Sequence, residues 1–226
     1  RDDVESRGLG DVYKRQIVVK GDHVLAGQKI AEAGGFVSAN IFASVSGTVK
    51  AIEARLGVAG GMQESIVIEN DGLYKEVEFS PERKLADISG KEIIEIIKEA
   101  GIVGMGGAGF PTHVKYMPKD PSAIDYIIVN CAECEPYITC DDQLMRTRSM
   151  ELAEGMRILL KLFPAAEGVF LIEDNKPEAI AAMEKACAGD EKLKVHAAKC
   201  KYPQGGERSI IQVIAGIDLK LSLIHI

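Results

Sequence analysis

The stretch that decides the fold of the second half of this chain is a short apolar run followed at once by polar residues, Ile124-Asp125-Tyr126-Ile127-Ile128-Val129-Asn130-Cys131-Ala132-Glu133-Cys134-Glu135-Pro136-Tyr137. Residues 124–129 predict a buried strand. Further along the chain, helices predicted over 144–163, 177–187 and 206–214 alternate with strands predicted over 168–172 and 193–197. Alternation with connections this short indicates an α/β layer built on a largely parallel sheet.

The first part of the chain predicts a different, β-rich module over residues 17–80. Short apolar strands separated by glycine turns, among them 41–49 and 65–72, are typical of a small sandwich or barrel. A charged connection over 75–88 leads into a helix, for which Ser89 and Glu92 predict a capping box and Gly101 marks the end.

Composition narrows the classes of function. The net charge is −7 over 226 residues, which argues against a nucleic-acid-binding protein because such a protein normally presents a basic face. No apolar run reaches the roughly 18–20 residues that a membrane span needs. Five cysteines, an odd number, do not suggest a secreted disulfide framework and favour a reducing compartment.

The two ends of the chain carry a second kind of signal. Residues 11–16 can be encoded as GAT GTG TAT AAG AGA CAG, and residues 221–226 as CTG TCT CTT ATA CAC ATC. These strings are reverse complements and match a transposon end used in sequencing libraries. We therefore expect residues 1–16 and 221–226 to be translated adaptor, and the natural sequence to continue beyond residue 220.

The densest candidate for ligand binding is the glycine-rich stretch over 104–109, which contains G-x-G-x-x-G. A standard Rossmann turn is disfavoured because a predicted helix, not a strand, precedes it. Backbone without Cβ atoms can still approach a phosphate or a flat ring closely. Pro111 suits the start of a following helix, and Lys115 adds a cation. A tight structural turn is the alternative.

Polar residues follow the strand over 124–129, at the end where α/β sheets bind ligands. Asn130 offers a donor and an acceptor, and Glu133 and Glu135 offer acceptors for hydroxyl or amide groups; a solvated acidic loop is the alternative. Cys131, Cys134 and Cys140 provide three thiols where a zinc or iron–sulfur site needs four ligands, so no metal site is predicted.

A third stretch, residues 202–207, opens a predicted helix with a Gly-Gly pair, which is another geometry that favours anions. Tyr202 could cover a ring and Glu207 could bond a sugar hydroxyl. An ordinary loop into a terminal helix is the alternative.

Together, the stretches 104–115, 130–145 and 202–207 strongly resemble the RnfC family, the NADH-oxidising subunits of bacterial ion-translocating Rnf electron transport complexes. The resemblance covers essentially all of residues 17–220 and extends more weakly to the flavin subunit of respiratory complex I. Residues 17–80 are similar to a biotinyl/lipoyl-like module, although the modified lysine of true carrier domains has no counterpart.

The resemblance implies an α/β protein in which a small barrel-sandwich hybrid (17–80) is followed by a Rossmann-like FMN/NADH-binding domain (88–220). It implies noncovalent FMN and assigns residues to two contact sets. The FMN set is Gly104, Gly106, Gly107, Lys115, Asn130, Glu133, Tyr202, Gly205 and Glu207, and the NADH set is Phe110 and Glu135.

The implied activity is electron exchange between NAD(H) and ferredoxin, with no acid–base side chain nominated because the chemistry belongs to the cofactor. Two [4Fe–4S] clusters are expected in a C-terminal region beyond this sequence. The implied partners are the other Rnf subunits, at the cytoplasmic face of the membrane and without a span in this chain. A stand-alone RnfC-like flavoprotein (cobalamin- or proline-reductase type) and a non-redox nucleotide-binding scaffold are the alternatives.

Overall fold

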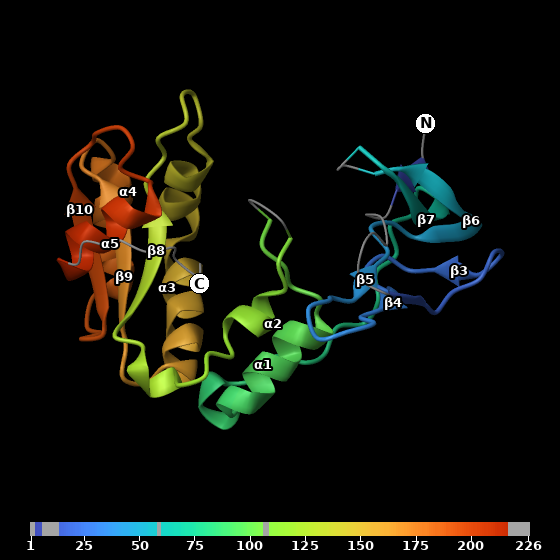
Figure 1. The fold of residues 1–226 in the computed structure, drawn as a ribbon, viewed down its shortest axis with the longest axis horizontal. Helices are drawn as coiled ribbons and strands as arrows, with labels where there is room; N and C mark the ends of the chain where they lie inside the picture. Colours follow the sequence, from blue (N-terminus) through green and yellow to red (C-terminus); the bar gives the residue numbers. More distant parts are fainter. Residues whose placement is uncertain (1–2, 6–13, 58–59, 106–108, 217–226) are drawn as a thin grey trace. The chain divides into compact units, whose positions relative to one another are not determined.

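The computed structural model describes residues 3–5, 14–57, 60–105 and 109–216, and the chain divides into two compact units, Arg1–Met117 and Pro118–Ile226 (Figure 1). Each unit has its own sheets and its own core. The domain limits predicted at 17–80 and 88–220 remain predictions.

The first unit contains two antiparallel sheets, in the orders β1-β7-β6-β3 and β2-β4-β5. A buried apolar cluster that includes Val24, Ile30, Val49 and Ile68 forms its core, which confirms the predicted β-rich module. The strands are β1 (Asp3–Glu5), β2 (Arg15–Gln16), β3 (His23–Val24), β4 (Lys29–Glu32), β5 (Ile41–Phe42), β6 (Gly47–Leu56) and β7 (Met62–Asn70).

The single strand predicted over 41–49 was wrong. The chain leaves one sheet after Phe42 and enters the other at Gly47. Ser46, at the crossing, is fully buried, and its hydroxyl donates to the carboxylate of Asp71 at 2.7 Å. Apolar alternation persists because both sheets bury side chains in the same core, so the pattern records burial and does not record the change of sheet.

The helix after the charged connection forms as predicted. α1 (Gly90–Glu99) follows a 3-10 turn, η1 (Leu85–Asp87), and Ser89 and Glu92 make a complete capping box. The end of α1 is attached to the β module of its own unit, because the side chain of Asn40 donates to the carbonyl of Glu99 at 3.1 Å. Lys29 also pairs with the carboxylate of Glu99 at 2.6 Å. A short helix, α2 (Thr112–Lys115), completes the helices of this unit.

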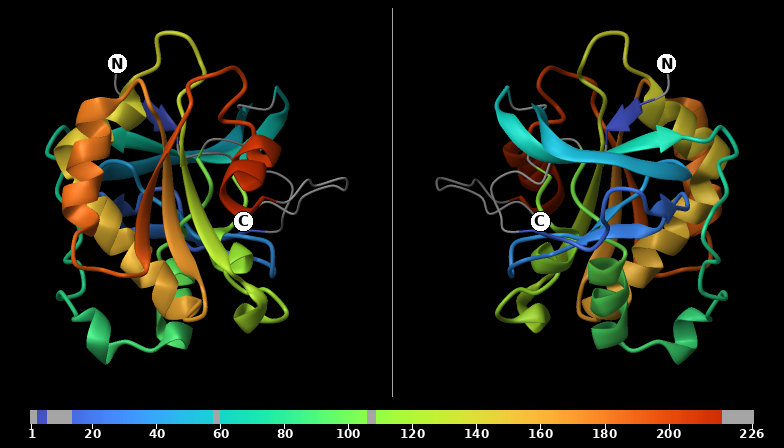
Figure 2. Two further views of the ribbon diagram at one scale, coloured as in Figure 1. Left: turned by 90° about the vertical axis from the view of Figure 1, so that its left-hand side faces the viewer. Right: turned by 90° about the vertical axis from the view of Figure 1, so that its right-hand side faces the viewer.

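The second unit is built on a parallel sheet, as the alternating pattern predicts, and its strand order is β10-β9-β8. Figure 2 shows α3 and α4 on one face of this sheet and α5 on the other, where Ile210 packs on Leu171 and Ala198. The elements are η2 (Pro121–Ala123), β8 (Tyr126–Cys131), α3 (Cys140–Leu162), β9 (Glu167–Glu173), α4 (Pro177–Cys187), β10 (Leu193–Ala198) and α5 (Glu207–Ala215).

The central strand β9 is buried along nearly its whole length, which explains its continuous apolar sequence. Gly168 on β9 allows α3 to approach closely, because a Cβ there would lie 2.6 Å from the Cγ of Met156. Among the helices that the structure describes, none combines the length and apolar character needed to cross a membrane.

The close approach at Gly101 gives a stability prediction. Gly101 has φ +63°, and a Cβ there would lie 2.6 Å from the carbonyl oxygen of Asn40, whereas Gly72 has φ +72° with nothing within 4 Å. Gly72→Ala is expected to cost about 1 kcal/mol for the left-handed backbone alone. Gly101→Ala should cost about 3 kcal/mol, because steric overlap adds to that strain. Urea unfolding of both variants checks the difference; equal losses would contradict it.

Candidate functional site

Three loops leave the carboxyl ends of the parallel strands, over residues 132–139, 174–176 and 199–206. The last two are joined by hydrogen bonds: the amide of Asp174 donates to the carbonyl of Ala198 at 2.8 Å, and the amide of Cys200 donates to the carboxylate of Asp174 at 2.9 Å. This edge is the position at which open α/β sheets bind ligands.

Asn130 joins the loop after β8 to the loop after β10. Its Nδ2 donates to the carbonyl oxygen of Gly205 at 3.0 Å, and its Oδ1 accepts from the amide of Ala132 at 3.2 Å. Gly205 is tightly enclosed, since a Cβ there would lie 3.1 Å from the Sγ of Cys134 and 3.2 Å from the oxygen of Ala132. The structure therefore brings together Asn130 and Gly205, two of the predicted site residues.

Glu133 lies inside the loop after β8 and holds the N-terminus of α3. Its carboxylate accepts from the amides of Asp141 at 2.8 Å and Asp142 at 3.2 Å, the second and third residues of the helix. Thr139, at the N-cap position, makes no capping bond through its side chain. A carboxylate at this position satisfies exposed helix amides and interacts favourably with the helix dipole.

A lysine from the loop after β9 completes the surroundings of Glu133. The Nζ of Lys176 lies 3.0 Å from the Oε2 of Glu133, and the two side chains are 16% and 1% exposed. Burial favours a raised pKa for Glu133, but the hydrogen bonds from Asp141, Lys176 and Asp142 outweigh it and lower the pKa. The hydrogen bond to Glu133 in turn raises the pKa of Lys176, so both groups are charged near neutral pH.

Lys176 was not among the predicted site residues. The signal available in the sequence was its position between a buried strand and Pro177, the first residue of α4, where the chain turns at the carboxyl edge of the sheet. Nothing in the sequence pairs it with Glu133, since 43 residues separate the two.

The loop after β10 contains the remaining predicted residues of this unit and one that was missed. Tyr202 is 85% exposed, and Glu207 is the first residue of α5. Gln204, between them, is 1% exposed, and among the described residues neither its Oε1 nor its Nε2 has a hydrogen-bond partner. Glu135, in the loop after β8, is exposed.

The glycine-rich stretch belongs to the first unit, and the described residues on its two sides are hydrogen-bonded to each other. The amide of Gly104 donates to the carbonyl of Phe110 at 2.9 Å, and the amide of Thr112 donates to the carbonyl of Ile102 at 2.9 Å. The Nζ of Lys115 lies 5.9 Å from the centre of the Phe110 ring and would lie 3.4 Å from a Cβ at Gly104. Gly104, Phe110 and Lys115 are thus brought together.

Two predictions for this stretch concern its glycines and the helix that follows it. Gly106 and Gly107, both predicted to contact FMN, lie outside the described residues. Pro111, expected at the first position of a helix, is instead at the N-cap of α2, whose first residue is Thr112 and which is a single turn. The loop follows α1, not a strand, so it does not have the strand–turn–helix order of a Rossmann turn.

The cysteines of C-x₂-C-x₅-C do not gather into one set of ligands among the residues that the structure describes. The group with ligand atoms within 4.8 Å of one another is instead Glu133, Cys140 and Asp141. Three donors already occupy the carboxylate of Glu133, which leaves little of its acceptor capacity for a cation. Cys131 is buried, and burial together with Asp141 and Glu133 raises its pKa to about 12.

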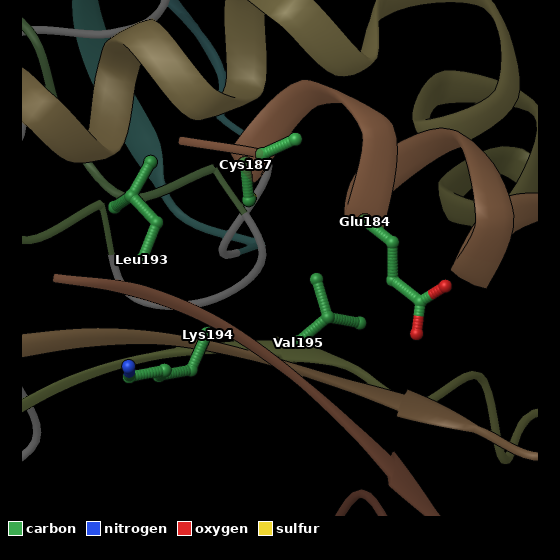
Figure 3. Close-up of a pocket in the computed structure, with 6 residues that line it drawn as sticks. Glu184, Cys187, Leu193, Lys194 and Val195 are labelled. Carbon is green, nitrogen blue, oxygen red and sulfur yellow. The ribbon is translucent and has the colours of Figure 1, made fainter. Parts of the chain in front are cut away.

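An open surface pocket of about 270 Å³ lies elsewhere in this unit, between the end of α4 and the start of β10 (Figure 3). Its lining includes Glu184, Cys187, Leu193 and Val195. These residues are at the amino end of β10, whereas the predicted site residues of this unit lie at or after the carboxyl ends of the strands. The pocket is therefore separate from the carboxyl edge of this sheet.

Comparisons with known proteins give two family matches. The family model described as the RnfC barrel sandwich hybrid domain matches residues 11–73, and the one described as the Nuo51 FMN-binding domain matches residues 97–223. An NAD⁺-reducing [NiFe]-hydrogenase in the air-oxidised state is 26% identical, with a TM-score of 0.48, over 57% of this chain and 24% of that chain.

Two curated relatives are the C components of ion-translocating complexes. The C component of the Na⁺-translocating ferredoxin:NAD⁺ oxidoreductase complex of Acetobacterium woodii is 42% identical over 204 residues, which cover 90% of this chain and 46% of the relative. The proton-translocating counterpart of Clostridium ljungdahlii is 46% identical over 204 residues, 90% of this chain and 44% of the relative. The chain thus spans a little under half the length of these relatives.

The resemblance read from the three polar stretches is confirmed by these matches. The FMN-binding match alone extends over more than half of the 226 residues, and the barrel-sandwich match precedes it. The chain therefore belongs to the Nuo51 FMN-binding domain family, among its RnfC members.

Proposed function

We propose that this chain binds FMN without a covalent link and exchanges electrons between NAD(H) and that flavin, as the FMN subunit of an ion-translocating Rnf complex. The observation that carries the proposal is the joined carboxyl edge of the parallel sheet, where Asn130 bonds Gly205 and Lys176 bonds Glu133. This edge lies inside the segment that matches the FMN-binding family, and relatives named as parts of ferredoxin:NAD⁺ oxidoreductase complexes support the activity.

The residues present fit such a cofactor. The edge carries a buried carboxamide, Gln204, that has no partner among the described residues, as expected of a group that awaits a ligand. In the first unit, Lys115 makes no ion pair with a carboxylate of the described chain, although its ammonium lies close to Gly104. An ammonium beside glycine backbone suits a phosphate.

The chain's own part in the reaction is to bind and orient. Bound FMN would supply the hydride acceptance and the one-electron release that connect NAD(H) with single-electron carriers. Asn130 retains a second Nδ2–H for a ring or ribityl group, and Tyr202 is exposed enough to cover a ring. Glu133 acts indirectly, because its carboxylate is occupied in holding α3 and Lys176.

The remaining predicted contacts are carried forward as part of the proposal. In the first unit, Gly104 and Lys115 would hold the FMN phosphate, and Phe110 would stack on NADH. In the second, Glu207 would bond the flavin and Glu135 the NADH. No acid–base side chain is assigned, since hydride transfer to a flavin requires none from the protein.

For the whole protein, we propose electron exchange with ferredoxin through two [4Fe–4S] clusters carried outside this chain. The names of the relatives support a complex of several proteins that translocates Na⁺ or protons. This protein would associate peripherally with the membrane partners, on the cytoplasmic face.

The proposal predicts a spectroscopic result. The full chain, mixed with FMN and desalted, should retain flavin, and anaerobic NADH should bleach the flavin absorbance near 450 nm, as for flavin in general. Retained flavin that does not respond to NADH would contradict the proposed NAD(H) site. A folded sample that retains no flavin would contradict FMN binding and favour a non-redox scaffold.

The role of Lys115 predicts a difference between two flavins. Lys115→Met should weaken FMN binding about tenfold or more, because a charge-assisted bond to the phosphate is lost, and should leave riboflavin binding unchanged. Fluorescence titration measures both affinities, with Lys119→Met, at an exposed lysine, as the matched control. Equal weakening of FMN and riboflavin by Lys115→Met would refute a phosphate contact.

The buried carboxylate predicts a pH-dependent stability. Glu133→Gln should lower the free energy of unfolding at pH 7 by about 2–3 kcal/mol, since it removes charge-assisted bonds to Lys176 and to the start of α3. The folded-state pKa of Glu133 is lowered, so its contribution is present above the unfolded pKa near 4.3 and is lost as pH falls through the folded value.

The two unfolding curves should therefore converge at acid pH. Glu135→Gln, an exposed carboxylate two positions along the chain, is the matched control and should stay within about 0.5 kcal/mol of the wild type. Denaturant unfolding from pH 7 down to pH 3 gives the comparison. A Glu133→Gln deficit that persists unchanged at pH 3 would show that the charge is not its cause.

A further inference from the structure

Gln204 is a buried polar side chain with no partner among the described residues, and it lies at the edge where the strands of the parallel sheet end. The residue is 1% exposed, and both its Oε1 and its Nε2 lack a hydrogen-bond partner in the described chain. Buried polar groups in native proteins are nearly always paired, because an unpaired one loses its hydration without compensation. Two unpaired atoms on one side chain therefore call for a specific explanation.

The local backbone does not supply the missing partners. The amide of Gln204 itself donates to the carbonyl of Lys201 at 2.6 Å, and the amide of Gly206 donates to the carbonyl of Pro203 at 3.1 Å. The carbonyl of Gly205 is taken by the side chain of Asn130 at 3.0 Å. These backbone groups are therefore paired within the turn or with Asn130 of β8, and none of them is hydrogen-bonded to the carboxamide of Gln204.

The position of this loop connects Gln204 to the candidate site. Gly205 lies against Ala132 and Cys134, in the loop after β8, so Gln204 adjoins the contact that joins two loops of the carboxyl edge. Tyr202, two residues before it, is 85% exposed. The loop thus holds an exposed aromatic ring and a buried carboxamide within three residues.

We propose that the carboxamide of Gln204 recognises the imide edge of the flavin ring, through a small rearrangement of the turn that exposes it to the ligand. A carboxamide presents one N–H donor and one C=O acceptor side by side. A ligand group that pairs with both must carry an acceptor and an N–H donor side by side. The isoalloxazine ring carries such a pair in its N3–H and the adjacent carbonyls. This inference rests on the proposed function and adds a specificity-determining residue to it.

The carboxamide of nicotinamide also carries a donor and an acceptor side by side, so the test must distinguish a contact with the flavin from a contact with nicotinamide. Gln204→Leu is compared with the wild type and with Gln212→Leu, a matched change at an exposed glutamine on α5. Three quantities are measured on the full chain: the unfolding midpoint without flavin, the dissociation constants of FMN and N3-methyl-FMN, and the NADH concentration that half-reduces the bound flavin.

The proposal expects opposite effects on the free and the bound protein. Without flavin, Gln204→Leu should unfold at the wild-type temperature or above, because it removes an unpaired buried amide. With FMN, it should bind about 10- to 30-fold more weakly, the loss expected for two hydrogen bonds. N3-methyl-FMN, which lacks the N3–H, should bind wild type and variant alike. Gln204→Met repeats the comparison if the leucine variant does not fold.

Other results overturn the proposal in distinguishable ways. If Gln204→Leu leaves the FMN affinity unchanged but raises the NADH concentration that half-reduces the flavin, then Gln204 contacts nicotinamide, and the flavin contact is refuted. A lower unfolding midpoint without flavin, at unchanged affinities, would make Gln204 a structural residue paired with an internal water. Failure of the wild type to bind FMN would refute the proposed function itself, whereas wild-type binding with an unaffected variant refutes only the role of Gln204.

Discussion

The second unit depends on a buried carboxylate at the start of its longest helix. Glu133, with a side chain 1% exposed, accepts hydrogen bonds from the first turn of α3 and from Lys176. An uncompensated charge at this depth would be expensive, and removal of either partner leaves the other poorly solvated. Since the two charged groups come from the loops after β8 and β9, the interaction also holds these loops at the carboxyl edge.

The same edge explains how a chain without a nominated acid or base can serve redox chemistry. A cofactor that performs the reaction requires the protein to bind and orient it, and hydrogen bonds here join the loops after all three strands. Among the described residues of this edge, the amide of Gln204 is buried without a partner, and exceptions to polar satisfaction concentrate at functional sites.

Local signals were sufficient for much of the fold. Three features appeared as predicted because they depend on neighbours in sequence or on simple alternation. They are the Ser89–Glu92 capping box, the helix over Pro177–Cys187 and the parallel direction of β8, β9 and β10. The prediction of a single strand over 41–49 was wrong, because alternation indicates that side chains are buried and does not indicate which sheet they belong to. A helix follows Pro111 as expected, but it begins one residue later, at Thr112, with Pro111 at the N-cap.

The sequence by itself determined the class of protein: a β-rich module, an α/β layer and three polar stretches whose order and spacing identify an FMN-binding family. Only the tertiary structure decided what individual side chains do. It assigned Glu133 to a helix N-terminus, paired it with Lys176 across 43 residues, and left Gln204 buried without a partner in the described part of the chain. The physical reason is that periodicity and capping are properties of neighbouring residues, whereas hydrogen-bond satisfaction depends on which distant loops the packed sheet brings together.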